Sequence, residues 1–259
     1  MVRGGPKLDH GRRRELGQSF QDGGRHYQQV RPGYPEESAR WLVPAGARDA
    51  LDAGAGTGKF TELLLGMGLS VTAVDPSTDM LEQLRAHYPA ATAVQATAEA
   101  TGLPAAAFDV VSVAQAWHWC DALAASTELA RVLRPNGTLG LIWNQLDTSV
   151  PWVHRLSRIM HAGDVYKPGF RPQVGPEFGD LEGHVTHWQD QVTTTDLVEL
   201  AKSRSYYLRA GETTRAKVLA NLDWYLHDHL GHRLDEELKL PYLTLTWRAI
   251  KARRRAVNG

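Results

Sequence analysis

The stretch "LDAGAGTGKFTELL", residues 51–64, places Gly54, Gly56 and Gly58 at alternate positions, followed by a lysine. Glycine lacks a Cβ and tolerates positive φ, so such a turn lets the backbone lie directly against a ligand. Three ligands suit a turn of this kind: the phosphates of ATP, the pyrophosphate of a dinucleotide, or a nucleoside cofactor without phosphate. Residues at fixed distances from the glycines discriminate among them.

The two phosphate patterns match poorly. An ATP-binding loop reads G-x-x-x-x-G-K-[ST], which would need a glycine at position 53 and a hydroxyl at position 60. Those positions hold Ala53 and Phe60. A dinucleotide loop reads G-x-G-x-x-G, whereas the spacing from Gly54 is G-x-G-x-G. The second mismatch argues against NAD without excluding an NAD(P)-dependent oxidoreductase.

S-adenosylmethionine fits the remaining pattern, because it carries a ribose but no phosphate. Asp75 ends the apolar segment "SVTAVD", about twenty positions after the first glycine. A carboxylate there can accept hydrogen bonds from both ribose hydroxyls. The rival interpretation is a tight strand–helix turn with no ligand. The joint occurrence of the glycines and Asp75 favours the cofactor.

The surrounding segments alternate between strand and helix patterns. Strands are predicted at 49–54, 70–75, 91–96, 108–115 and 138–144, and helices at 35–43, 59–68, 77–89 and 121–133. The segment "RPNG", residues 134–137, reads as a turn. Strands that alternate with helices predict a doubly wound parallel sheet. Beyond residue 150, strands are expected at 184–195 and 240–252, and helices at 151–163, 196–208 and 213–230.

Several segments in this order resemble the motifs of class I S-adenosylmethionine-dependent methyltransferases: "LDAGAGTGKFTELL", "VTAVDPSTDML", "ATAEATGLPAAAFDVVSVAQAWHWCD" and "LARVLRPNGTLGLIWN". With "YQQVRPGYP" upstream and "AQAWHW" after the fourth strand, the chain is similar to the trans-aconitate methyltransferase-like branch of small-molecule enzymes. The resemblance implies a Rossmann-like sheet of seven strands with helices on both faces. The first five strands would be parallel, and a last hairpin would add an antiparallel one. A helical elaboration would lie near the active site.

The resemblance also implies a cofactor site for S-adenosylmethionine, with S-adenosylhomocysteine as the product. Arg31, on a lid segment, would bind the methionine carboxylate, and Asp75 would hold the ribose. Many relatives carry an aspartate where Thr97 stands at the adenine edge. The implied cofactor residues are Tyr27, Arg31, Asp52, Gly54, Gly56, Gly58, Asp75, Pro76, Ser77, Met80, Thr97, Ala98, Glu99 and Gln115.

The reacting end would lie at the carboxyl end of the fourth strand. His118 is the candidate catalytic residue, either as a general base near neutral pH or as a group that positions the acceptor. Trp117, Trp119 and Asn144 are the further candidates for substrate contact. A carboxylate acceptor would need no base, because it is already ionised at pH 7.

Composition limits the partners. The 29 basic and 29 acidic side chains cancel, which gives no general field for nucleic acid or an anionic membrane. The single cysteine, Cys120, cannot form an internal disulfide, and a cytoplasmic location is expected. No window has the roughly 18 apolar residues of a membrane span. The scattered histidines lack ligand spacing, so no metal is expected.

The expected organisation is one methyltransferase domain over residues 1–259. Residues 1–20 would be a flexible tail, residues 21–150 the cofactor-binding core with its lid, and residues 151–259 the substrate-shaping helices and the last two strands. A monomer or homodimer that methylates a small molecule at oxygen or nitrogen is the predicted enzyme. The alternatives are an oxidoreductase and a non-catalytic protein that binds S-adenosylmethionine.

Overall fold

A computed structural model of the chain describes residues 31–162, 166 and 169–252. Tyr27 and the predicted tail at residues 1–20 lie outside the described residues. Within the described part, no helix is long and apolar enough to cross a bilayer.

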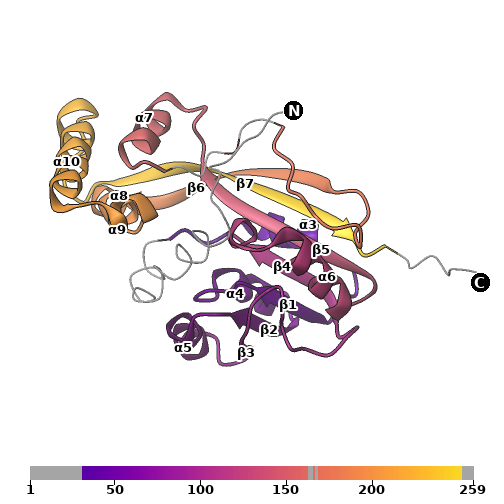
Figure 1. Ribbon diagram of the computed structural model, residues 1–259. Coiled ribbons are helices and arrows are strands. Elements are labelled where there is room, and N and C mark those ends of the chain that lie inside the picture. The colour runs from indigo at the N-terminus through magenta and orange to yellow at the C-terminus, as the bar shows by residue number, and fades with distance from the viewer. Residues whose placement is uncertain (1–30, 163–165, 167–168, 253–259) are drawn as a thin grey trace, which may run out of the picture.

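A sheet of seven strands organises the described residues (Figure 1). The strands are β1 (Asp49–Ala53), β2 (Ser70–Asp75), β3 (Thr92–Gln95), β4 (Phe108–Ala114), β5 (Leu133–Leu146), β6 (Glu182–Thr193) and β7 (Glu237–Ile250). Their order across the sheet is β3-β2-β1-β4-β5-β7-β6. The first five pair in parallel, and β7 runs antiparallel to both neighbours. This confirms the predicted Rossmann-like sheet with its antiparallel last pair.

Helices connect most of the strands along the chain. They are α3 (Glu36–Leu42), α4 (Lys59–Gly66), α5 (Thr78–His87), α6 (Ala122–Val132), α7 (Pro151–Ile159), α8 (Thr194–Lys202), α9 (Ser205–Arg209) and α10 (Glu212–Asp223). A 3-10 turn spans Trp117–Trp119, and a π-helical turn, Trp224–His229, follows α10. The side chains of Ser77 and Asp121 accept hydrogen bonds from the first backbone N–H groups of α5 and α6.

Side chains alternate across the parallel strands and so build two cores. Ala50 of β1 and Ile142 of β5 pack with α3, α4 and α5 on one face. Leu51 and Leu141, their sequence neighbours, pack with α6 on the other face. Both faces of the central strands are therefore buried, which is why these segments read as continuous apolar runs.

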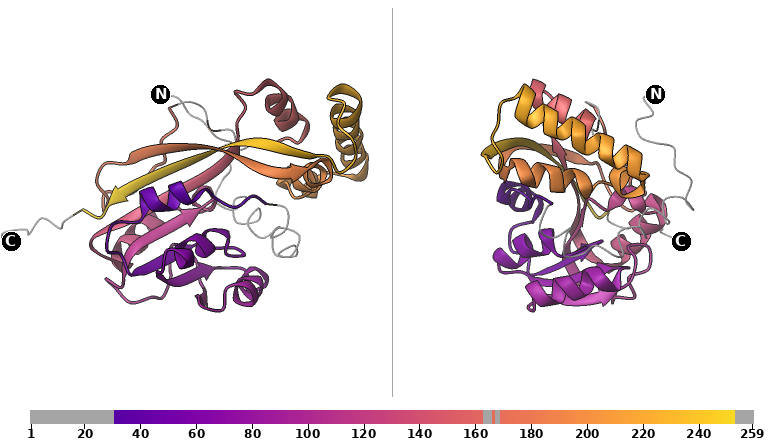
Figure 2. Two further views of the ribbon diagram at one scale, coloured as in Figure 1. Left: turned by 180° about the vertical axis from the view of Figure 1, so that it is seen from behind. Right: turned by 90° about the vertical axis from the view of Figure 1, so that its left-hand side faces the viewer.

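A third core forms beyond the parallel part, where α7, α8 and α10 pack together at one end of β6 and β7 (Figures 1 and 2). Leu156, Leu200 and Leu222, from these three helices, are buried in it. Strand β7 reaches both regions, because Leu240 lies in this third core and Ala249 in the core beneath α6. We call α7 to α10, with the π-helical turn, the helical lobe.

The segment predicted as a turn at residues 134–137 is instead the irregular beginning of β5. Leu133 pairs with Phe108 and Thr138 with Val110, so the register shifts between the two pairs. Asn136 takes a left-handed φ of 65° inside this shift. The turn-forming residues are thus accommodated as a bulge in a strand that starts directly at the end of α6.

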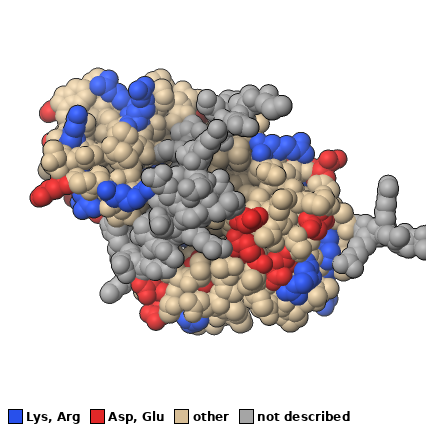
Figure 3. Space-filling model, viewed as in Figure 1, with Lys and Arg blue, Asp and Glu red and all other residues tan. Residues whose placement is uncertain are grey.

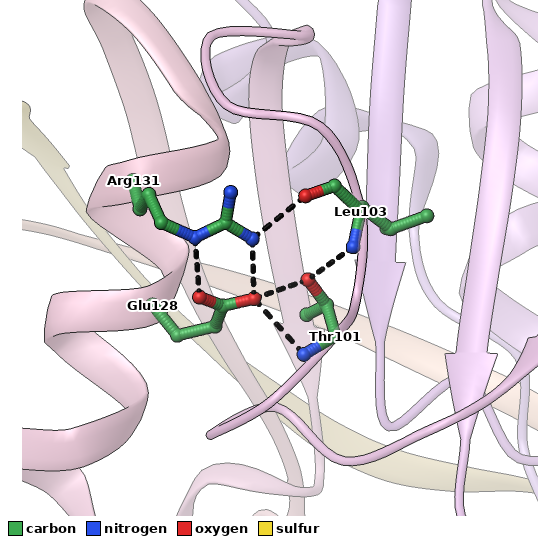
Figure 4. Close-up of polar contacts among 4 residues, drawn as sticks. All are labelled: Thr101, Leu103, Glu128 and Arg131. Atoms are coloured by element: carbon green, nitrogen blue, oxygen red, sulfur yellow. Dashed lines mark hydrogen bonds and ion pairs between the residues drawn. The ribbon is translucent and has the colours of Figure 1, made fainter.

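The carboxylate of Glu128, on α6, anchors the loop that follows β3 (Figure 4). It accepts hydrogen bonds from the backbone N–H and hydroxyl of Thr101 and from the guanidinium of Arg131. Arg131 also donates to the carbonyl of Leu103 at 2.7 Å. The bonds from Arg131, together with those from Thr101, lower the pKa of Glu128 to about 2.

We expect Glu128→Gln to destabilise the protein in a pH-dependent way. A folded-state pKa below the usual value stabilises the fold above about pH 4.5, and this contribution is lost as the pH falls towards 2. At pH 7 the variant should lose about 1–2 kcal/mol, allowing for solvent screening. Urea denaturation between pH 7 and pH 3 measures this. The difference from wild type should shrink at low pH, whereas Glu82→Gln, an exposed site on α5, should change little at any pH. A difference for Glu128→Gln that is constant with pH would contradict this account.

Candidate functional site

Most of the predicted cofactor residues lie at one edge of the sheet. The loop after β1, the end of β2 and the end of β4 meet there because these strands pair in parallel. Asp75 is the last residue of β2, and Gln115 follows β4 directly. In open α/β sheets this carboxyl edge is where ligands bind.

The glycine loop crosses the end of β2 with a left-handed backbone at each glycine. The φ angles of Gly54, Gly56 and Gly58 are 71°, 56° and 93°. The N–H groups of Gly54 and Ala55 both donate to the carbonyl of Val74, at 2.7 and 3.0 Å. Such φ angles favour glycine at all three positions.

The three glycines differ in what a side chain would meet. A Cβ at Gly54 would lie 2.5 Å from the Cβ of Ala116, and one at Gly58 would lie 2.7 Å from the ring of Tyr88. A Cβ at Gly56 would meet nothing within 4 Å. Protein packing therefore requires two of the glycines, and the third borders open space.

Asp75 joins the glycine loop to the start of α5. Its Oδ2 accepts from the N–H of Gly56 at 2.8 Å, and its Oδ1 accepts from the N–H of Ser77 at 2.9 Å. The side chain is almost buried, at 8% exposure. Burial raises its pKa, and the two N–H bonds partly oppose that shift. Each carboxylate oxygen keeps lone-pair capacity for one further donor.

Asp52 lies beneath the loop with no exposed surface. Its two oxygens accept hydrogen bonds from the hydroxyls of Thr61, at 2.7 Å, and Ser112, at 2.9 Å. Burial raises its pKa to about 6 in spite of these bonds. Both oxygens are thus engaged within the protein, and Asp52 ties β1 to β4 and α4.

The residues predicted at the adenine edge follow β2 and β3. Met80 and Ala98 are buried, whereas Pro76 and Thr97 are exposed. The carboxylate of Glu99 accepts from the N–H of Asp121, the residue that caps α6, at 2.9 Å. The loop after β3 is therefore held at this end by Glu99 and further along by Glu128.

Gln115 and Asn144 connect the ends of β4 and β5 to distant parts of the chain. Gln115, at a left-handed φ of 55°, donates from Nε2 to the carbonyl of Asn144 at 2.7 Å. Asn144 donates from Nδ2 to the carbonyl of Gly33 at 2.7 Å, and its Oδ1 accepts from the hydroxyl of Thr244 at 2.6 Å. Both ends of this amide are therefore engaged within the protein, and Asn144 links the segment before α3 to β7.

The tryptophans beside His118 are in unlike surroundings. Trp117 is buried, and its indole N–H donates to the carbonyl of Gln173 at 3.0 Å. It is therefore a core residue rather than an open pocket wall. Trp119 is partly exposed, with its ring centroid 4.5 Å from that of His118.

A residue that sequence reasoning missed orients His118. The indole N–H of Trp143, on β5, donates to Nδ1 of His118 over 3.4 Å. Trp143 is itself buried against Tyr166 and Phe170. Accepting at Nδ1 assigns the imidazole proton to Nε2, on the other side of the ring. The strand pattern could place Trp143 inside the sheet, but nothing in the sequence signals its partner.

Arg31 joins the segment before α3 to the helical lobe. Its Nη2 donates to the carbonyl of Ser203, at the end of α8, over 3.0 Å. Nearby in sequence, Tyr34 packs edge-on against Phe60 of α4, with centroids 5.3 Å apart. These contacts and the Asn144–Gly33 bond hold residues 31–34 against β5, α4 and the end of α8.

The histidines outside the site have other partners. His184 lies 2.8 Å from Glu37 and stacks on Trp41, and His232 lies 3.0 Å from Glu236. Among residues 31–162, 166 and 169–252, no group of three or more His, Cys, Asp or Glu side chains could hold a metal ion.

Comparisons with known proteins agree with this geometry. Residues 51–141 match the model of a methyltransferase domain family. An uncharacterized methyltransferase of Mycobacterium tuberculosis is 41% identical over 241 residues, which cover 93% of this chain and 98% of the relative. A malonyl-[acyl-carrier protein] O-methyltransferase of Enterobacter lignolyticus is 44% identical over 90 residues, which cover 34% of this chain and 36% of the relative.

A solved structure from Anaeromyxobacter dehalogenans, provisionally assigned as a type II methyltransferase, has a TM-score of 0.66 with this chain at 28% sequence identity. The similarity covers 85% of this chain and 97% of the other. The shared fold therefore extends well beyond the residues that the family model matches.

We expect Asp52→Asn to become relatively more stable as the pH rises. A carboxyl whose folded pKa lies above its usual value of 3.8 favours folding when protonated, and that advantage is lost as the pH rises through about 6. The amide stays neutral and can still pair with both hydroxyls. Denaturant unfolding at pH 4 and pH 7.5 should show a relative gain of about 1–3 kcal/mol for the variant at the higher pH. Asp79→Asn, an exposed site on α5, should show no such trend. A relative loss for Asp52→Asn at pH 7.5 would contradict the account.

Proposed function

This chain belongs to the class I S-adenosylmethionine-dependent methyltransferases, and we propose that it methylates an oxygen of a small molecule, with a carboxylate as the acceptor. The family assignment counts against the oxidoreductase alternative. Support for oxygen as the acceptor comes from the resemblance of "YQQVRPGYP" and "AQAWHW" to the trans-aconitate methyltransferase-like branch. The partial similarity to an enzyme named for O-methylation points the same way.

The open space beside Gly56 is the observation that carries the proposed cofactor site. The backbone N–H of Gly56 bonds to the carboxylate of Asp75, whose oxygens can each accept one further hydrogen bond. A ribose with two neighbouring hydroxyls matches that acceptor pair. In this proposal Gly54 and Gly58 shape the loop, and Asp52 supports it from below through Thr61 and Ser112.

The remaining predicted residues would surround the two ends of the cofactor. Pro76, Ser77 and Met80 would border the adenine from the start of α5, with Thr97, Ala98 and Glu99 along its polar edge. Gln115 would face the amino-acid end. Arg31 would bind the methionine carboxylate, since its planar donor fork suits a carboxylate; one of its guanidinium nitrogens bonds to Ser203.

The chemistry needs alignment more than reactive groups. When bound, S-adenosylmethionine supplies an electrophilic methyl group on a sulfonium. The task of the chain is to hold an acceptor oxygen in line with that methyl group and to exclude water, which can supply most of the acceleration. A carboxylate acceptor is ionised at pH 7, so no residue has to remove a proton.

His118 fits a positioning role better than a basic one. Because Nδ1 accepts from Trp143, the ring carries its proton on Nε2. A neutral imidazole in this tautomer carries its hydrogen-bond donor on Nε2. We therefore assign His118 to holding an acceptor oxygen through Nε2–H.

The proposed site is tested by comparing cofactor binding in the wild-type protein and in Gly56→Ala. S-adenosylhomocysteine should bind the wild-type protein and raise its melting temperature, whereas NAD and NADP should not. In Gly56→Ala the added methyl group fills the open space, so we expect at least about 10-fold weaker binding by calorimetry.

The matched control is Gly68→Ala. Gly68 also has a left-handed φ, 80°, and open space at its Cβ position. It follows the C-terminal end of α4, however, whereas the glycine loop precedes the N-terminal end of that helix. Both variants should carry similar backbone strain, of about 1–2 kcal/mol. Equal affinity of the two variants for S-adenosylhomocysteine would contradict the proposed site.

A screen of carboxylic acids with labelled cofactor first identifies an acceptor. The turnover of His118→Gln with that acceptor then distinguishes a positioning role from base catalysis. The glutamine amide still donates a hydrogen bond, so we expect the turnover rate to fall about 10-fold and the pH–rate profile to stay unchanged. His87→Gln, an exposed site on α5, is the control. A loss of about 10²–10⁴-fold, together with loss of a limb near pH 6.5, would make His118 the base.

A further inference from the structure

A second pocket lies in the helical lobe, away from the glycine loop. Its volume is about 640 Å³, and it opens between α7, α9 and α10. None of its lining residues belongs to the predicted cofactor or acceptor site. They are His154, Arg155, Arg158, Ile159, His161, Tyr206, Thr214, Lys217, Val218 and Asn221.

The spacing of these residues along α7 and α10 places them on one face of each helix. On α10 they are Thr214, Lys217, Val218 and Asn221, which recur every three or four positions and so lie along one face. On α7, Arg155 and Arg158 are three positions apart and also share a face. Both helix faces line the pocket, with Lys217 from α10, two arginines from α7, and Ile159 as an apolar residue.

The lining is strongly cationic. It holds two guanidinium groups, one ammonium group and two imidazoles, and no carboxylate. Figure 3 shows Lys and Arg side chains gathered over the end of the molecule that α7 and α10 form, while acidic side chains lie mostly lower on the same face. A concave surface lined by one sign of charge concentrates ions of the other sign.

The three permanent cations of the pocket have no carboxylate partner within the part of the chain that the structure describes. Some arginines elsewhere are paired with carboxylates, as Arg131 is with Glu128 and Arg248 with Glu182. The guanidinium of Arg155 instead lies over the rings of Trp224 and Tyr225, 5.2 and 5.5 Å from their centroids. Stacking orients this group and leaves its N–H donors available at the edge.

One wall of the pocket is a flat pair of rings. His161 and Tyr206 stack with centroids 3.8 Å apart and an interplanar angle of 21°. His161 has a left-handed φ of 47°, an uncommon conformation for a residue other than glycine. A ligand with a compact body can rest against this wall while its anionic groups face the cations.

We propose that this pocket is a second binding site, for a small organic molecule that carries two or more negative charges. Arg158 and Lys217, which reach it from the two facing helices, supply the principal contacts, and Thr214 and Asn221 add neutral hydrogen bonds. Carboxylate and phosphate groups share the chemistry that these donors recognise. The site is separate from the carboxyl edge of the sheet, so it extends the proposed function rather than restating it.

Calorimetry at constant ionic strength tests the proposal with citrate and pyrophosphate as probes. At least one probe should bind the wild-type protein saturably, and the one that binds more tightly identifies the anionic group. Arg158→Gln and Lys217→Gln, both at exposed positions, should each weaken that binding about 10-fold, as loss of one charge-assisted contact would. Lys239→Gln, an exposed lysine on β7, is the matched control and should bind like wild type.

The affinity for S-adenosylhomocysteine is measured in the same variants, which separates this test from the cofactor site. That affinity should be unchanged in all three variants. That result also shows that the variants are folded. The proposal is overturned if neither probe binds saturably, or if Lys217→Gln and Lys239→Gln bind the better probe equally well.

Discussion

The crossing of the glycine loop over the end of β2 is the constraint on which the site depends. Two loop N–H groups bond to the carbonyl of Val74 and a third bonds to Asp75, so the loop is fixed to its neighbouring strand rather than only to its own helix. This crossing requires a left-handed backbone at three positions. Packing excludes a side chain at two of them, and only Gly56 borders open space. The pattern of alternate glycines therefore combines two positions that packing requires with a third that borders open space.

The carboxyl edge is completed by long-range hydrogen bonds that converge on β5. Asn144 links residues 31–34 to β7, and Trp143 orients His118. The guanidinium of Arg31, in the same segment, donates a hydrogen bond to the carbonyl of Ser203 at the end of α8. Strand β7 then continues into the core of the helical lobe. One continuous set of contacts thus joins the proposed cofactor site to the helices that contain the second pocket.

The sequence predicts the elements well because their causes are local. Continuous apolar runs mark strands buried on both faces, and the glycines and Asp75 occur at fixed distances along the chain. It predicts less where a residue's role depends on a distant partner. Asn144 bonds to Gly33 and Thr244, and buried Trp117 bonds to Gln173; none of these three partners is signalled locally. The "RPNG" segment reads as a turn, yet the pairing of β4 with β5 makes it a bulge. The cationic pocket also escapes prediction, because α7 and α10 converge only in the tertiary structure.

The most direct test of this account is a crystal structure of the protein with S-adenosylhomocysteine. The account predicts the ribose hydroxyls within hydrogen-bond distance of both oxygens of Asp75, the amino-acid end of the ligand passing over the backbone of Gly56, and Asp52 still bonded to Thr61 and Ser112. A ligand bound away from this edge, or a ribose held by groups other than Asp75, would contradict the proposed site.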